Sequence, residues 1–271
     1  MVVKEIFKEY TRLNNEIETL FEESKMKKFL PETENVILIP IYNEQKHIFN
    51  VLREVRKFSQ DDIIVINDGS TDESQIIVEE ISSCARLKGN IHILSHLKNE
   101  GYGQSLIDGI AFANKYNYKY LFTLDCDEQH EPELIPKFLK EIKKGKEDII
   151  SGSRYFAYNE KIDNPPEDRF KINFKITRLI NQITGFNLTD SFCGFKVYHV
   201  EGLKKLKLTE KGYGFPLQLW IQAYKTHLKV KELAVNMIYL DKNRTFGGHL
   251  DNPKRRLKYY MEIIDREVKN D

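Results

Sequence analysis

Two aspartates, Asp125 and Asp127, stand one residue apart at the end of an apolar stretch, in the sequence LFTLDCDEQHEP over 121–132. Carboxylates this close repel each other unless a positive charge lies between them. Alternate residues that leave a strand can turn toward one hard cation, and oxygen ligands suit Mg²⁺ or Mn²⁺. Gln129 offers a further oxygen. The spacing predicts a divalent cation site formed by Asp125, Asp127 and Gln129. The alternative is that the acidic pair caps the helix that EPEL opens.

Apolar segments on either side indicate the elements that position these aspartates. Runs that predict strands cover 35–40, 62–66, 91–95, 118–124 and 148–153, with helical segments between them. Strands separated by helices of about 10–15 residues predict parallel βαβ units in a doubly wound sheet, an α/β fold. In such sheets ligands bind at the carboxyl ends of the strands. One expected helix, over STDESQIIVEEI, has Ser70 as its predicted N-cap and Glu73 three residues on.

Residues with useful chemistry follow four of the predicted strands. In chain order they are Pro40, Tyr42, Glu44, Asp68, Asp125, Asp127, Gln129 and Arg154. Because the carboxyl ends of parallel strands meet at one edge of a sheet, we expect these side chains to gather there. A zinc site through His130 is disfavoured, since no second histidine has ligand spacing to it.

Composition excludes several classes of protein. The net charge of +1 argues against a nucleic-acid partner. The three cysteines form no CxxC pair, which favours a reducing compartment over a zinc finger or disulfide framework. No apolar run approaches the roughly 20 residues of a membrane span, and the charged N-terminus does not resemble a signal peptide. We therefore expect a soluble cytoplasmic protein.

Two common phosphate-binding motifs are missing from the sequence. It contains no GxxxxGK[ST], which excludes a P-loop. The dinucleotide fingerprint GxGxxG belongs directly after the first strand, but that strand ends in PIYNE. The GxG at Gly101–Gly103 follows the third strand and has Leu106 in place of the last glycine. A dehydrogenase is therefore not expected.

Six motifs occur in an order that resembles family 2 glycosyltransferases. They are IPIYNE (39–44), INDGSTDES (66–74), NEGYGQSLIDGI (99–110), LDCDEQHEP (124–132), SGSRY (151–155) and DSFCGFKVY (190–198). Within that family the chain looks most like the polyprenyl-phosphate sugar synthases, the dolichol-phosphate mannose synthase branch. The resemblance implies a GT-A fold over 35–250, a Rossmann-like and mostly parallel sheet flanked by helices. Apolar spacing predicts an amphipathic helix within 1–34, and a last helix, within 251–271, is expected to pack on the domain.

The resemblance also implies roles for single residues in binding a nucleotide sugar. Pro40, Tyr42 and Glu44 match the first nucleotide-contacting motif, with Tyr42 placed to stack on the base. Asp68 matches an aspartate that hydrogen-bonds the base edge. Asp125, Asp127 and Gln129 match residues that hold the cation and the diphosphate, and Arg154 matches a basic residue that faces phosphate.

Three departures from the branch affect the donor and the acceptor. Lys196 stands in CGFK where the branch has arginine, which keeps the charge and loses the bidentate fork. Arg244 and Gly247 match a downstream pattern, but His249-Leu250 replaces its Ser-Lys. Asn67 stands where many relatives have aspartate. Lys196 and Arg244 are also expected to bind the nucleotide sugar. With Arg154, these cations exceed what one diphosphate with a metal needs, which suggests a second anion.

These observations predict inverting transfer of a hexose from a nucleoside-diphosphate sugar to a polyprenyl-phosphate acceptor. A phosphate acceptor is already anionic, whereas a sugar or glycan hydroxyl needs a base, for which Asp190 is the candidate. A role for Asp190 in capping or orienting the strand remains open, as do a hydroxyl acceptor and a nucleotide-sugar sensor without turnover. The basic segment 253–260 leaves open a peripheral contact with the inner face of a membrane, and homo-oligomers are also left open.

Overall fold

The computed structural model describes residues 31–83, 90–156, 165–238 and 245–270. Residues 33–271 form one unit, and the elements below all belong to it. The helix predicted within 1–34 falls on residues 1–30 and so lies outside the described residues. None of the described helices is long and apolar enough to cross a membrane.

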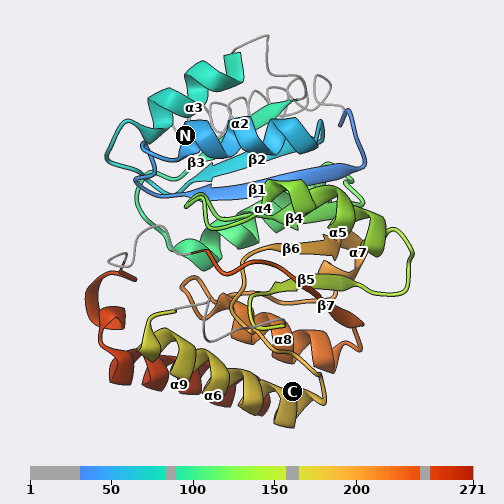
Figure 1. The fold of residues 1–271 in the computed structure, drawn as a ribbon, viewed down its shortest axis with the longest axis vertical. Coiled ribbons are helices and arrows are strands. Elements are labelled where there is room, and N and C mark those ends of the chain that lie inside the picture. Colours follow the sequence, from blue (N-terminus) through green and yellow to red (C-terminus); the bar gives the residue numbers. More distant parts are fainter. Residues whose placement is uncertain (1–30, 84–89, 157–164, 239–244, 271) are drawn as a thin grey trace, which may run out of the picture. The chain divides into compact units, whose positions relative to one another are not determined.

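In the described part of the chain, seven strands form one sheet in the order β3-β2-β1-β4-β6-β5-β7 (Figure 1). Their bounds are β1 Asn35–Ile41, β2 Asp62–Asn67, β3 Ile91–Ser95, β4 Tyr120–Thr123, β5 Ile149–Ser153, β6 Lys196–His199 and β7 Val230–Ala234. Strands β1 to β4 are mutually parallel, as predicted. Strands β1 and β2 are buried along their whole length, which explains why their sequences are almost continuous runs of apolar residues.

Strand β6 runs antiparallel between β4 and β5, an arrangement that the sequence pattern did not indicate. Its first residue, Lys196, pairs with Thr123 near the carboxyl end of β4 and with Ser151 of β5. The segment 190–195 that precedes β6 is therefore brought to the carboxyl ends of β4 and β5. The sheet is mixed, and a loop from late in the chain joins the edge where the sequence predicts a site.

Helices cover both faces of this sheet. Their bounds are α2 Ile48–Phe58, α3 Ser74–Ser83, α4 Tyr102–Lys115, α5 Ile135–Ile142, α6 Glu167–Thr184, α7 Val200–Leu203, α8 Phe215–Lys225 and α9 Pro253–Lys269, with short 3-10 turns η1 Pro132–Leu134 and η2 Gly248–Asp251. Apolar residues of α2, α3 and α5 join Ile37, Ile39 and Ile41 in one core. Helix α4 packs on the other face, where Gly109 leaves room for Leu38. Helices α6, α8 and α9 pack on one another.

Helix α3 begins at Ser74, four residues later than the predicted N-cap at Ser70. The Ser70 hydroxyl instead accepts a hydrogen bond from the amide of Asn43, at 3.0 Å, and so ties the loop after β2 to the loop after β1. The Asp72 carboxylate accepts from the amide of Ser74, the first residue of the helix, at 3.0 Å. The capping-box prediction was wrong because Ser70 serves a contact distant in sequence.

Candidate active site

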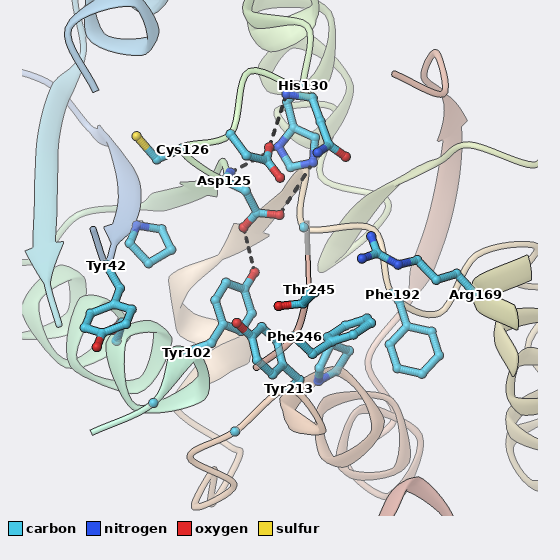
Figure 2. A pocket seen from close by; sticks show the side chains of 18 of the residues that line it. Tyr42, Tyr102, Asp125, Cys126, His130, Arg169, Phe192, Tyr213, Thr245 and Phe246 are labelled. Atoms are coloured by element: carbon cyan, nitrogen blue, oxygen red, sulfur yellow. Dashed lines mark hydrogen bonds and ion pairs between the residues drawn. The ribbon is translucent and has the colours of Figure 1, made fainter. Parts of the chain in front are cut away.

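The carboxyl ends of the strands border a cavity of about 640 Å³. Eight residues predicted from strand ends line it: Pro40, Tyr42, Glu44, Asp68, Asp125, Asp127, Gln129 and Arg154. Tyr42 keeps 46% of its surface exposed, so its ring is open to a stacking partner. Figure 2 shows Tyr42 on one side of the cavity, Arg169 on the other and Asp125 between them.

Asp125 is held at the centre of the cavity by two neighbours. The hydroxyl of Tyr102, the first residue of α4, donates to its Oδ1 at 2.8 Å. Nδ1 of His130 accepts from the Asp125 amide at 3.1 Å, so the proton of a neutral His130 lies on Nε2, 3.7 Å from Asp125 Oδ2. Figure 2 shows both rings directed at the carboxylate. Asp125 is thus oriented before any ligand arrives.

Gly194, in the segment before β6, passes directly against this carboxylate. A Cβ atom at Gly194 would lie 2.1 Å from Asp125 Oδ2, well inside van der Waals contact. Any side chain here would displace Asp125 or push β6 away from β4. The glycine of the CGFK motif is therefore required by the close approach of two segments.

The donor set at this point fits a hard divalent cation. Asp125, Asp127 and Gln129 all line the cavity and offer oxygen atoms, and Asp127 Oδ1 also accepts from the Gln129 amide at 3.1 Å. Among the described residues, no group of three His, Cys, Asp or Glu side chains is placed to hold a metal. Mg²⁺ commonly binds through one or two carboxylates and completes its shell with water and substrate phosphates. The set suits a cation that arrives with a diphosphate.

Asp68 fastens the loop after β3 to the end of β2. Its Oδ1 accepts from the Glu100 amide at 2.7 Å, and its Oδ2 accepts from the Gly101 amide at 2.9 Å. Gly69, with φ of 69°, lets the backbone at Lys98 approach to a distance that no side chain would allow. Asn67, by contrast, points into its own loop, where Oδ1 accepts from the Ser70 amide. Its side-chain amide nitrogen, which an aspartate lacks, donates to Oε1 of Gln75 on α3 at 2.5 Å, and this bond accounts for the departure at position 67.

Arg154 and Asp190 form a bidentate ion pair. Arg154 Nε lies 2.7 Å from Asp190 Oδ2, and a terminal guanidinium nitrogen lies 3.0 Å from Oδ1. Asp190 is completely buried and also accepts from Asn173 at 2.7 Å and from the Phe192 amide at 3.0 Å. Burial by itself would raise the pKa of Asp190, but Arg154 and these donors lower it to about 2. The sequence left two roles open for Asp190, as a base or as an orienting residue. A carboxylate with so many donors and such a low pKa suits the orienting role.

Lys196 does not take the nucleotide-contacting position predicted for it. Its side chain is buried, its ammonium donates to the Cys193 carbonyl, and Nζ lies 5.4 Å from the centre of the Trp220 ring. Burial lowers the pKa of Lys196. Within the described residues, Lys196 is absent from the cavity wall. Arg244, the other predicted cation, lies outside the described residues.

The family model of glycosyl transferase family 2 matches residues 36–207. This chain belongs to that family. An uncharacterized protein of Methanocaldococcus jannaschii is 32% identical, over 76% of this chain and 89% of the relative. The UDP-N-acetylglucosamine–dolichyl-phosphate N-acetylglucosaminyltransferase of Methanococcus voltae is 27% identical, over 79% and 89%, and the undecaprenyl-phosphate mannosyltransferase of Micrococcus luteus is 25% identical, over 78% and 87%. The glycosyltransferase thus has relatives in the polyprenyl-phosphate sugar synthase branch.

A solved structure supports the same fold for this glycosyltransferase. Glucosyl-3-phosphoglycerate synthase from Mycobacterium tuberculosis, in complex with Mn²⁺, UDP and glucosyl-3-phosphoglycerate, matches with a TM-score of 0.65. The match covers 86% of this chain and 79% of the synthase at 14% identity. The predicted GT-A fold is confirmed.

Several residues of the cavity wall in this glycosyltransferase were not found from the sequence. Tyr102 and Tyr213 stack at 5.6 Å between ring centres, and Phe246 meets Tyr213 edge to face. Arg169 of α6 and Arg256 of α9 both lie against the Phe246 ring, at 4.9 and 4.5 Å. Tyr102 lies within GYG, which resembles part of a dinucleotide fingerprint, and Arg256 lies within the basic segment PKRRLKYY. No sequence motif marks the other three, Arg169, Tyr213 and Phe246, because only the packing of α6, α8 and α9 brings them to the cavity.

Proposed function

We propose that this glycosyltransferase transfers a hexose, with inversion, from a nucleoside-diphosphate sugar to a polyprenyl-phosphate acceptor. The observation that carries the proposal is the saturated pairing of Asp190 with Arg154. A hydroxyl acceptor requires a group that takes its proton, and the ideal pKa of such a group lies near the working pH. The pKa of Asp190, at about 2, is far from that range. A phosphate acceptor attacks as an anion and needs no base.

The donor fits the side of the cavity formed by the ends of β1, β2 and β4. Tyr42 and Asp68 both line this side of the cavity. In the proposed complex Tyr42 stacks on the base and Asp68 accepts a hydrogen bond from its edge. Asp125, Asp127 and Gln129 would hold Mg²⁺ or Mn²⁺ with the diphosphate, where the cation supplies positive charge to the leaving group. Arg154, oriented by Asp190, adds a positive charge from the end of β5. Glu44 supports this side of the cavity, since its carbonyl accepts from the amides that open α2.

The acceptor phosphate fits the side of the cavity formed by α6 and α9. Arg169 and Arg256 both line this part and share the Phe246 ring between them. Arg256 is buried, bonded to the Leu250 carbonyl at 2.9 Å and paired with Asp168, which fixes its guanidinium. Planar guanidinium groups are well suited to phosphate. These two arginines supply the positive charge for a second anion that the buried Lys196 does not supply. The names of the relatives from Methanococcus voltae and Micrococcus luteus agree with such an acceptor.

The outer face of α6 supports a peripheral contact with an anionic lipid surface. Lys171, Phe174, Lys175 and Arg178 recur at helical spacing, and all four are exposed. Phe174 keeps 64% of its surface in solvent and stacks loosely on Phe170. Helix α9 contacts α6, and Figure 1 shows the two helices side by side. Basic side chains attract acidic headgroups, at about 1 kcal/mol each, and the same helices carry Arg169 and Arg256 into the cavity.

Two assays test the proposed function. A thermal-shift panel of UDP, GDP, CDP and dTDP sugars, with and without Mn²⁺, identifies the donor, because a ligand of the folded state raises the melting temperature. Transfer from that donor is then measured to a short-chain polyprenyl phosphate and to the polyprenol of the same chain length. We expect transfer to the phosphate alone. Transfer to the polyprenol or to free sugars, with none to the phosphate, would place the chain in the hydroxyl-acceptor class.

A further inference from the structure

His96 lies between the carboxylates of Asp68, which lines the cavity, and Asp108. Its Nδ1 is 2.7 Å from Asp68 Oδ1, and its Nε2 is 2.9 Å from Asp108 Oδ2. The side chain of His96 is 10% exposed and that of Asp68 4%, so water screens the contact between these two little. Both distances are those of N–H···O bonds. Each ring nitrogen of His96 therefore faces a carboxylate oxygen, to which it donates when it carries the ring proton.

The far end of this bridge is itself fixed. Asp108 lies on α4, and the amide nitrogen of Gln104, one turn earlier, is 3.0 Å from each of its carboxylate oxygens. The amide of His96 donates to the Asn67 carbonyl at 2.9 Å, which holds the end of β3 beside the end of β2. His96 therefore transmits the position of α4 to Asp68 through a rigid ring.

The bridge also limits what Asp68 can still bind. A carboxylate has about four acceptor positions. In the described structure, Oδ1 accepts from His96 and from the Glu100 amide, and Oδ2 accepts from the Gly101 amide. One acceptor position on Oδ2 is left, on a residue that lines the cavity. Because the amides of Glu100 and Gly101 both donate to this carboxylate, Asp68 meets the ligand as a hydrogen-bond acceptor.

We propose that His96 is a positioning residue that sets base specificity by holding Asp68 as a fixed hydrogen-bond acceptor. Such an acceptor selects nucleobases with a ring N–H, namely uracil, thymine or guanine. It rejects cytosine and adenine, whose corresponding ring nitrogen carries a lone pair. The inference rests on the proposed function in one respect, that the cavity binds a nucleotide with its base toward Asp68.

Two variants that differ by one methylene group test the role of each ring nitrogen. His96→Asn places an amide N–H near the position of Nδ1 and keeps the bond to Asp68. His96→Gln carries its amide N–H toward Asp108 and leaves Asp68 without that donor. Binding of UDP, GDP, CDP and ADP, each with Mn²⁺, is measured by calorimetry on the full chain. Inorganic pyrophosphate with Mn²⁺ serves as the ligand without a base.

For the unmodified chain we expect the better of UDP and GDP to bind about 5- to 150-fold more tightly than CDP and ADP, the range for one buried hydrogen bond. His96→Asn keeps this ratio within about threefold, and His96→Gln reduces it to less than about threefold. Pyrophosphate binding stays unchanged in both. That last readout separates a positioning role from a merely structural one, which would weaken every ligand.

The inference would be overturned if both variants showed the same ratio of UDP or GDP affinity to CDP and ADP affinity. A parallel loss of pyrophosphate binding in His96→Gln would also overturn it. If nucleotides bind to the unmodified chain without base preference, the inference fails while the proposed function stands. If none of the four nucleotides binds, both fail. Should His96→Gln not fold, Asp108→Asn replaces it, since it weakens the support of the ring from the far side. A ratio in Asp108→Asn equal to that of the unmodified chain, with pyrophosphate binding unchanged, would then overturn the inference.

Discussion

Replacing Asp190 with asparagine separates its orienting role from a role as proton acceptor. Lowering the pKa of Asp190 from 3.8 to about 2 corresponds to about 2–3 kcal/mol of folding stability at neutral pH, because each pKa unit is worth about 1.4 kcal/mol. The amide would also turn an N–H group toward Arg154. We expect Asp190→Asn to lower the free energy of unfolding by at least about 2–3 kcal/mol. For a chain of this size the melting temperature falls by about 5–10 °C.

The effect of pH on this difference has a definite sign. The pKa of Asp190 is lower in the folded chain than in the unfolded chain, so its stabilisation is complete well above pH 3.8 and is lost as the pH falls toward 2. The stability difference between the unmodified chain and Asp190→Asn, measured by urea unfolding, should shrink by about 1 kcal/mol between pH 7 and pH 3. A difference that grows on acidification would contradict the ion pair.

Turnover completes the test. At a temperature where Asp190→Asn is folded, transfer to a short-chain polyprenyl phosphate should fall by no more than about tenfold, because Asp190 acts through Arg154 and no proton leaves the acceptor. Loss of a general base would cost about 10²- to 10⁴-fold. Unchanged stability at pH 7, together with a loss of transfer in that range, would refute the orienting role.

Three further predictions concern the cation site and the α6 surface. Asp127→Ala should abolish Mn²⁺-dependent nucleotide binding in calorimetry while the melting temperature of the free protein stays within about 2 °C; undiminished binding would remove Asp127 from the site. Gly194→Ala should displace Asp125 and weaken Mn²⁺-dependent binding by about tenfold or more, since its Cβ would lie 2.1 Å from a carboxylate oxygen; wild-type affinity would show that the contact relaxes freely. Phe174→Ser should reduce sedimentation with phosphatidylglycerol vesicles, whereas Phe49→Ser, equally apolar and 53% exposed on α2, should not; equal effects would rule out a specific α6 surface.

The fold was predictable where one segment carries its own signal. The apolar runs of β1 and β2 and the helical spacing of α2 are local patterns, and the structure has strands and a helix there. The direction and neighbours of β6 are not local, since nothing in KVYH states that it inserts between β4 and β5. Ser70 shows the same limit, because its hydroxyl binds a loop 27 residues away.

The candidate site was predictable where its residues directly follow a strand, and not where they depend on how distant helices pack. Residues that directly follow the parallel strands were brought to one cavity by the topology itself. The prediction for Lys196 was wrong. Its charge suggested a contact with an anion in the cavity, but its position on β6 directs the side chain into the core, against the Trp220 ring. Arg169 and Phe246 gave no signal, because their roles depend on how α6 and α9 pack.

The insertion of β6 has a consequence for how the chain acquires its structure. Strand β5 pairs only with β6 and β7 in the described sheet, and both are synthesised after it. Until residues 196–199 are available, β4 presents an open edge and β5 has no hydrogen-bonded neighbour in the sheet. Pairings over such sequence separations form slowly, since loop closure must precede them. The emerging segment up to β5 therefore carries an unpaired edge prone to association, and the cavity is complete only after β6 has inserted.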